Sequence, residues 1–186
     1  IYAAMIAEID RHTGRLVDYL RDRGELDNTA IIFMSDNGAE GHDYDDTWPR
    51  ESFPAIRKVI DERHDFSSAN MGRPRSYTFY GPNWARVSAP AFRHYKAFPT
   101  EGGVRTAAFA TFPGRFADGA ILDEMVLAKD LAPTVLQLAD VGHPGTEYAG
   151  RKVEMMTGES VLGLLETGKG HGRPRQHADE MLGKKG

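Results

Sequence analysis

The first residues that could do chemistry form the run Ser35-Asp36-Asn37-Gly38, which directly follows the apolar stretch Thr29 to Met34. That stretch is β-branched and shows no polar alternation, which predicts a strand covered on both faces. In open α/β sheets, ligands collect beyond the carboxyl ends of the strands. The carboxylate of Asp36 and the amide oxygen of Asn37 are hard donors that suit Ca²⁺ or Mg²⁺ better than zinc. These two residues are therefore candidate metal ligands.

The same residues have a simpler interpretation, because Asn37-Gly38 is also the favoured pair of a two-residue hairpin turn. A hairpin needs a returning strand, however. Residues 39–46 show neither the alternation nor the β-branching of a strand. This favours the ligand interpretation without excluding the turn.

A second candidate is Lys96, which precedes the run Glu101-Gly102-Gly103-Val104-Arg105. The run places charged side chains around a Gly-Gly turn that leads into another apolar segment. On residue types alone, a lone lysine is usually exposed to solvent. Lys96 therefore needs further support before it counts as a site residue.

The elements that must position these residues alternate between helix and strand. Apolar residues at helical spacing predict an amphipathic helix over 1–23, with Gly24 as its stop. Strands are predicted at 29–34 and 106–112, and 120–127 reads as a further strand or extended segment. A helix that feeds an apolar strand indicates an α/β sheet.

Residues 41–98 have a different character, because they are rich in proline and aromatic residues. They are expected to form a loop-rich excursion over the top of a sheet. One short helix is predicted inside it, with Ser52 as N-cap, Pro54 in the first turn, and Ile56, Val59 and Ile60 facing inward. The aromatic residues, Trp48 and Trp84 among them, either line a substrate cleft or pack the excursion onto the sheet.

The last third of the chain predicts two more helices. One begins after Asp130 as N-cap and ends by Gly142, and the other covers 160–166 with Gly168 as its stop. Residues 169–186 are rich in Gly, Lys and Arg and show no core pattern.

Composition narrows the partners. The chain has 186 residues, with 23 Lys+Arg against 27 Asp+Glu and a formal net charge of −4, which matches a nucleic-acid backbone poorly. No apolar stretch is long enough for a membrane-spanning helix. The absence of cysteine excludes disulfides and thiolate chemistry, but it fits periplasmic or secreted and cytoplasmic locations equally.

Several short motifs in collinear order resemble bacterial-type arylsulfatases. They begin with Gly24-Glu25-Leu26-Asp27-Asn28-Thr29 and Ser35-Asp36-Asn37-Gly38, followed by Lys96 with Glu101-Gly102-Gly103-Val104-Arg105. The others are Asn70-Met71-Gly72-Arg73-Pro74, Tyr80-Gly81-Pro82-Asn83-Trp84-Ala85, Ala132-Pro133-Thr134 and Gly142-His143-Pro144-Gly145. Together the motifs cover nearly the whole chain.

The resemblance implies the sulfatase fold of the alkaline phosphatase superfamily: a large mixed, mostly parallel sheet sandwiched by helices. It implies that Asp36 and Asn37 bind calcium, in preference to magnesium, and that Lys96 contacts the sulfate. It also implies a formylglycine nucleophile, made from a Cys or Ser in a Cys/Ser-x-Pro-x-Arg motif, and a small-molecule sulfate ester as substrate. Residues 1–168 then form a portion of the catalytic α/β domain, and 169–186 begin the connection to a C-terminal subdomain.

The chain departs from the family pattern in two respects. Its nearest match to the nucleophile motif, Ser88-Ala89-Pro90-Ala91-Phe92, has phenylalanine in place of arginine. The sequence also lacks the early strand with paired aspartates that, by the resemblance, completes the calcium shell. The expectation is therefore an internal or truncated portion of an arylsulfatase, inactive without the rest of the parent chain. Two alternatives stay open. One is a phosphatase or phosphodiesterase of the same superfamily, and the other is an inactive calcium-binding or interaction module.

Overall fold

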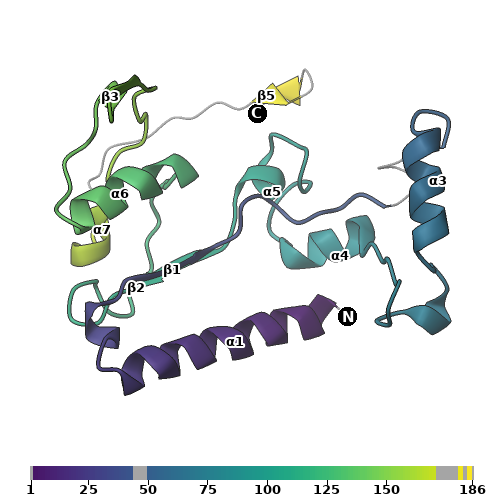
Figure 1. Ribbon diagram of the computed structural model, residues 1–186, viewed down its shortest axis with the longest axis horizontal. Coiled ribbons are helices and arrows are strands. Elements are labelled where there is room, and N and C mark those ends of the chain that lie inside the picture. Colours follow the sequence, from purple (N-terminus) through teal and green to yellow (C-terminus); the bar gives the residue numbers. More distant parts are fainter. Residues whose placement is uncertain (1, 44–49, 171–179, 182–183, 186) are drawn as a thin grey trace. The chain divides into compact units, whose positions relative to one another are not determined.

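The computed structural model describes residues 2–43, 50–170, 180–181 and 184–185 (Figure 1). The chain divides into two compact units. The first comprises residues 1–19, 37–107 and 178–186, and the second comprises 20–36 and 108–177. Asp36 therefore belongs to the second unit, whereas Asn37 and Lys96 belong to the first. Trp48 lies outside the described residues.

The predicted first helix is confirmed as α1, Tyr2–Asp22 (Figure 1). Past its end, Gly24 has a φ of +68°, and its N–H donates to the Arg21 carbonyl at 2.9 Å. Glycine adopts this left-handed conformation without the steric cost that other residues incur. No residue of α1 is buried, and Met5 is 60% exposed. Val17 and Leu20 are half-buried, so within the described residues the apolar stripe of this helix is only partly covered.

Two predicted strands are confirmed as β1, Ile31–Met34, and β2, Ala108–Thr111. They lie side by side and pair antiparallel, with Met34 opposite Ala108 (Figure 1). A short 3₁₀ turn, Leu26–Asn28, precedes β1. Because β1 ends at Met34, the run that begins with Ser35 starts at the end of this strand.

The prediction that this strand is covered on both faces is wrong for the described residues. Phe33 and Phe109 stack on each other with ring centroids 5.1 Å apart, yet they are 39% and 57% exposed. The reason is that β1 and β2 form a sheet of two strands alone. An apolar run indicates a strand made for burial, but it does not say whether the covering layers are present.

The remaining strands form two small antiparallel hairpins. One consists of β3, Glu147–Tyr148, and β4, Arg151–Lys152; the other consists of β5, Glu180–Met181, and β6, Lys184–Lys185. The described chain is thus mixed α/β. A large, mostly parallel sheet is not found among the described strands, and no strand forms over 120–127.

The excursion over residues 41–98 is more helical than predicted. The short helix is present as α3, Pro54–Arg63, but its N-cap is Phe53 and not Ser52. Ile56 and Val59 are 41% and 45% exposed, so the prediction that they face inward is wrong for these two residues, whereas Ile60 is half-buried.

A second helix in the excursion, α4, Gly81–Ser88, was not predicted. The sequence Gly81-Pro82 reads as a loop, although proline is also well suited to the first turn of a helix. The 3₁₀ turn Ser68–Asn70 lies between α3 and α4.

The second unit contains the other two predicted helices. They are α6, Leu131–Leu138, which follows the 3₁₀ turn Ala128–Asp130, and α7, Leu162–Thr167. The stop at Gly168 is confirmed by its φ of +65°. Helix α6 ends at Leu138, earlier than the predicted stop at Gly142.

A buried polar clasp joins the segments before α6 and α7. The side chain of Asp130 is fully buried and accepts hydrogen bonds from the backbone N–H groups of Leu127 at 2.8 Å and Glu159 at 2.9 Å. The Thr134 hydroxyl donates to the Asp130 carbonyl and accepts from the Val161 N–H at 3.0 Å. Asp130, the predicted N-cap of α6, makes no side-chain capping hydrogen bond to that helix. Its carboxylate binds the segments before α6 and α7 together.

We expect Asp130→Ala to lower the free energy of unfolding of this unit by about 2 kcal/mol, because it leaves two part-buried N–H donors without their charged, fully buried acceptor. Urea denaturation followed by circular dichroism measures the change. Asp123→Ala removes an exposed carboxylate from the same unit and should change stability by less than about 0.5 kcal/mol. Equal effects of the two substitutions would contradict the clasp.

Candidate functional site

The candidate sulfate-contacting lysine lies in a constrained loop. Two residues that flank the Tyr95-Lys96 pair, His94 and Ala97, have φ values of +59° and +71°. For residues with a Cβ atom this region costs about 1–2 kcal/mol each. Such conformations persist where the surrounding structure imposes them, and they are concentrated at functional sites. The loop therefore holds Lys96 in a defined place.

We expect Ala97→Gly to raise the free energy of unfolding by about 0.5–1 kcal/mol, because relief of the strain exceeds the entropic cost of glycine. In the full-length protein the same change should lower activity several-fold, since Lys96 becomes less restrained. Ala149 has a φ of +49° in the turn between β3 and β4. Ala149→Gly is therefore the matched control, which should gain stability without losing activity. A loss of activity in both variants would contradict the role of the Lys96 loop.

Backbone hydrogen bonds fasten this loop to the segment that begins at Asn37. The Gly38 N–H donates to the Gly103 carbonyl at 2.8 Å, and the Lys96 N–H donates to the Ala39 carbonyl at 3.0 Å. Gly103 belongs to the short helix α5, Glu101–Val104, which lies beside this segment (Figure 1). Residues far apart in the sequence are thus joined at the candidate site.

Three buried glycines make this approach possible. A Cβ atom on Gly38 would lie 2.0 Å from the Gly102 carbonyl oxygen. A Cβ on Gly102 would lie 2.0 Å from the His94 oxygen, and one on Gly103 would lie 1.9 Å from the Phe98 oxygen. Real Cβ atoms do not come so close to backbone atoms, so only glycine fits at these three positions. The Gly-Gly pair of the sequence motif is therefore a docking feature.

The side chain of Lys96 forms an ion pair with Glu40, with Nζ and Oε2 3.1 Å apart. The other carboxylate oxygen, Oε1, accepts a hydrogen bond from the His42 backbone N–H at 3.0 Å and lies 2.7 Å from His42 Nδ1. Partial burial opposes the charged form of Glu40, but these hydrogen bonds and the ammonium outweigh it, so the pKa of Glu40 is lowered. Glu40 therefore stays ionised beside Lys96 at neutral pH.

The two candidate metal ligands lie two and three residues after the end of β1. Asp36 is exposed and Asn37 is half-buried. The hairpin alternative does not hold, because a two-residue hairpin turn requires positive φ at one or both of its central residues, and neither Asn37 nor Gly38 has it. In addition, β1 pairs with the distant β2. Among the described residues, no three His, Cys, Asp or Glu side chains gather as a complete metal site requires.

The aromatic residues of the excursion contact one another. Tyr77 lies 6.0 Å from Phe66 and 5.2 Å from Phe79, measured between ring centroids, and it also contacts the ring of His64. Trp84 on α4 is 59% exposed. The Tyr77 cluster therefore packs residues of the excursion against one another. Trp84 is the exposed aromatic of α4 that could meet a ligand.

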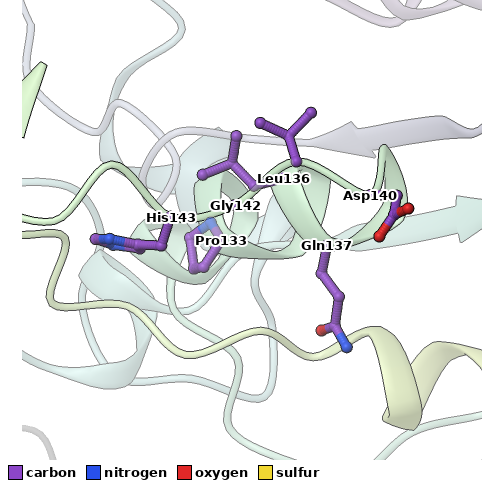
Figure 2. A pocket seen from close by; sticks show the side chains of 7 residues that line it. Pro133, Leu136, Gln137, Asp140, Gly142 and His143 are labelled. Atoms are coloured by element: carbon purple, nitrogen blue, oxygen red, sulfur yellow. The ribbon is translucent and has the colours of Figure 1, made fainter.

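A pocket of about 270 Å³ lies in the second unit, at the end of α6 and the turn that follows (Figure 2). It is lined by Pro133, Leu136, Gln137, Asp140, Val141, Gly142 and His143. None of these residues is a candidate metal ligand or the candidate lysine. The pocket therefore adds nothing to the assignment of the site.

Comparison with known proteins decides the family. The Sulfatase family model matches residues 1–141. The chain belongs to the sulfatase family. This membership, within the alkaline phosphatase superfamily, confirms the resemblance that the short motifs carry. The matched region includes Asp36, Asn37, Lys96 and the Gly102-Gly103 pair.

Two relatives of this sulfatase chain are particularly similar. An uncharacterized sulfatase of Schizosaccharomyces pombe is 40% identical over 170 residues, which cover 91% of this chain and 30% of that protein. An arylsulfatase of Klebsiella aerogenes is 34% identical over 168 residues, which cover 88% of this chain and 34% of that protein. The chain thus spans about a third of the length of these relatives.

A solved structure supports the fold of this sulfatase chain. The crystal structure of PsFucS1 sulfatase from Pseudoalteromonas sp. aligns with a TM-score of 0.53 and 24% identity, covering 95% of this chain and 26% of that chain. In the described part of this sulfatase chain, no helix is both long enough and apolar enough to cross a membrane.

The residues that sequence reasoning missed are Glu40 and His42. They lie in a stretch that was read only as lacking strand character. The signal in the sequence was that Glu40 is an acidic residue only a few positions after the candidate metal ligands Asp36 and Asn37. This spacing places Glu40 near the candidate site but does not indicate what it contacts. Its contact with Lys96 becomes visible only when the two segments are docked.

Proposed function

We propose that this chain forms part of the active site of an arylsulfatase, which hydrolyses sulfate esters to an alcohol or phenol plus sulfate. Membership of the sulfatase family and similarity to an arylsulfatase support the reaction class. One observation carries the proposal at the level of residues. It is the strained loop that presents Lys96, fastened by Gly38, Ala39 and Gly103 to the segment that begins at Asn37.

Lys96 is proposed to contact the sulfate. Its side chain is half-exposed, and a compact ammonium group offers three N–H donors. Donors held in place before the reaction stabilise the negative charge that builds on the oxygens of the transferred group. The strained loop meets this requirement, because it fixes the backbone from which the Lys96 side chain extends.

Asp36 and Asn37 are proposed to hold calcium. Their carboxylate and amide oxygens fit the preference of calcium for oxygen ligands, of which it takes about 6–8. The described residues supply no third acid or histidine to this pair, so the other ligands are proposed to come from elsewhere in the parent chain. When bound, calcium supplies a positive charge that polarises the sulfate oxygens.

The nucleophile is proposed to be a formylglycine outside this chain, because the chain has no cysteine and no Ser-x-Pro-x-Arg sequence. When present, this group supplies the hydroxyl that attacks sulfur. The residues of this chain bind and orient the sulfate. The exposed ring of Trp84 supports an aryl or otherwise apolar alcohol portion in the substrate.

The test is an assay of the full-length protein that carries this sequence, using paired aryl sulfate and aryl phosphate substrates with and without calcium. The expected result is calcium-dependent hydrolysis of the sulfate in clear preference to the phosphate. The 186-residue chain alone should turn over neither substrate. Preference for the phosphate would replace the proposal with a phosphatase. Tight calcium binding by an inactive full-length protein would indicate a binding module.

A further inference from the structure

Glu40 binds the candidate sulfate-contacting lysine with one carboxylate oxygen and is itself held through the other. Oε2 lies 3.1 Å from the Lys96 ammonium, and Oε1 is bound by the backbone N–H of His42 and lies within hydrogen-bond distance of its ring. The His42 ring is itself held, because it meets the Tyr95 ring edge-on at 5.8 Å. Both oxygens of the carboxylate are therefore engaged, so its rotation is restricted.

The ion pair is not what docks the two segments. The backbone hydrogen bonds from Gly38 to Gly103 and from Lys96 to Ala39 already join them. The ring of Tyr95 also closes over Gly41, where an added Cβ would lie 2.3 Å from the ring. The Glu40 carboxylate is therefore not needed to dock the Lys96 loop, although both of its oxygens are held. Its main effect should be on the group that it faces, the Lys96 ammonium.

We propose that Glu40 is a positioning residue for Lys96, which holds the lysine ammonium toward the sulfate of the substrate, while His42 fixes the Glu40 carboxylate. This inference rests on the proposed function, because it requires Lys96 to contact sulfate. Lysine has a flexible four-carbon stem, and the strained loop fixes only its backbone. Glu40 fixes the other end of the side chain.

The Lys96 side chain is 45% exposed, so its ammonium is accessible to a substrate. One N–H of the ammonium points to Glu40, and two remain for sulfate oxygens. Glu40 does not touch the reacting atoms in this scheme and acts only through Lys96.

The test is a double-mutant cycle in the full-length enzyme with the variants Glu40→Gln, Lys96→Met and the two combined. Glutamine matches glutamate in shape, but its amide NH₂ must face either the ammonium or the His42 N–H, both of which are donors. The measured quantities are kcat/KM for an aryl sulfate, the inhibition constant of inorganic sulfate, and the melting temperature. Lys58→Met and Glu62→Gln are matched controls, because these residues form an exposed ion pair, 3.9 Å apart, on α3.

We expect Glu40→Gln to lower kcat/KM by about 10- to 100-fold, the scale of a small misplacement of a catalytic group, and to weaken inhibition by sulfate. In the Lys96→Met background, the same change should alter kcat/KM by no more than about twofold, because Glu40 then has nothing to position. The controls should leave kcat/KM unchanged, and the melting temperature of Glu40→Gln should match theirs.

Three results would overturn the inference. An unchanged kcat/KM in Glu40→Gln shows that Lys96 needs no positioning. An equal loss in both backgrounds shows that Glu40 acts independently of Lys96, as a merely structural residue would. If Lys96→Met itself has no effect, then the proposed sulfate contact fails and the inference fails with it. That third result is distinct from the first two, in which Lys96→Met lowers activity.

Discussion

Replacing Asp36 by alanine should abolish stoichiometric calcium binding by the full-length enzyme and lower kcat/KM for an aryl sulfate by about 1,000-fold. A metal that polarises the transferred group is worth several kcal/mol, and each 1.4 kcal/mol or so corresponds to a factor of ten in rate. Asp36 lies two residues after the end of β1 and is exposed, so its removal leaves the packing of the strand intact. Calcium content by atomic emission, together with turnover, measures both effects.

Asp27→Ala is the matched control, because Asp27 is an exposed aspartate of the same unit, in the 3₁₀ turn that precedes β1. It should keep both calcium and activity. Asn37→Ala should have a smaller effect than Asp36→Ala, since it removes a neutral ligand and not a charged one. Full calcium occupancy in the Asp36→Ala enzyme would remove Asp36 from the metal site.

Gly103→Ala should separate the Lys96 loop from the segment it docks on. The added Cβ would lie 1.9 Å from the Phe98 carbonyl oxygen, and this neighbour is backbone, which cannot turn away as a side chain can. Overpacking of this kind costs about 1–3 kcal/mol and sometimes more, and here it also disturbs the hydrogen bond from Gly38 to the Gly103 carbonyl. We expect a loss of about 3 kcal/mol in the free energy of unfolding and activity close to background.

The control for this substitution is Gly14→Ala, which adds a methyl group in open space on the exposed side of α1. Alanine is the better helix former by about 1 kcal/mol, so this variant should gain stability and keep its activity. The two changes are chemically identical and differ only in their surroundings. If both were neutral, then the close docking around Gly103 would be wrong.

The features that were predictable from the sequence are those decided by nearby residues. The end of α1 depends on the conformational freedom of Gly24, and the end of α7 depends on that of Gly168, so both could be placed in advance. The apolar run of β1 was equally clear. Its partner was not, because an apolar strand shows the same pattern whether its neighbour is parallel or antiparallel.

The interactions that could not be predicted are those between distant segments. Nothing in the residues around Glu40 indicates that it meets Lys96, because the contact depends on three glycines whose role appears only when the loops are docked. Helix α4 was missed because Gly81-Pro82 suits a loop as well as a helix start. The roles of Asp36, Asn37 and Lys96 toward metal and sulfate remain predictions.

The way in which the Lys96 loop is fastened has a consequence for how such enzymes can be diversified. The attachment to residues 38 and 39 uses backbone atoms and glycines, so it does not depend on the side chains of residues 50–92. Substitutions of those side chains should therefore leave the position of Lys96 unchanged. Protein engineers can randomise residues 50–92 to seek new alcohol portions while they keep the loop that is proposed to contact sulfate.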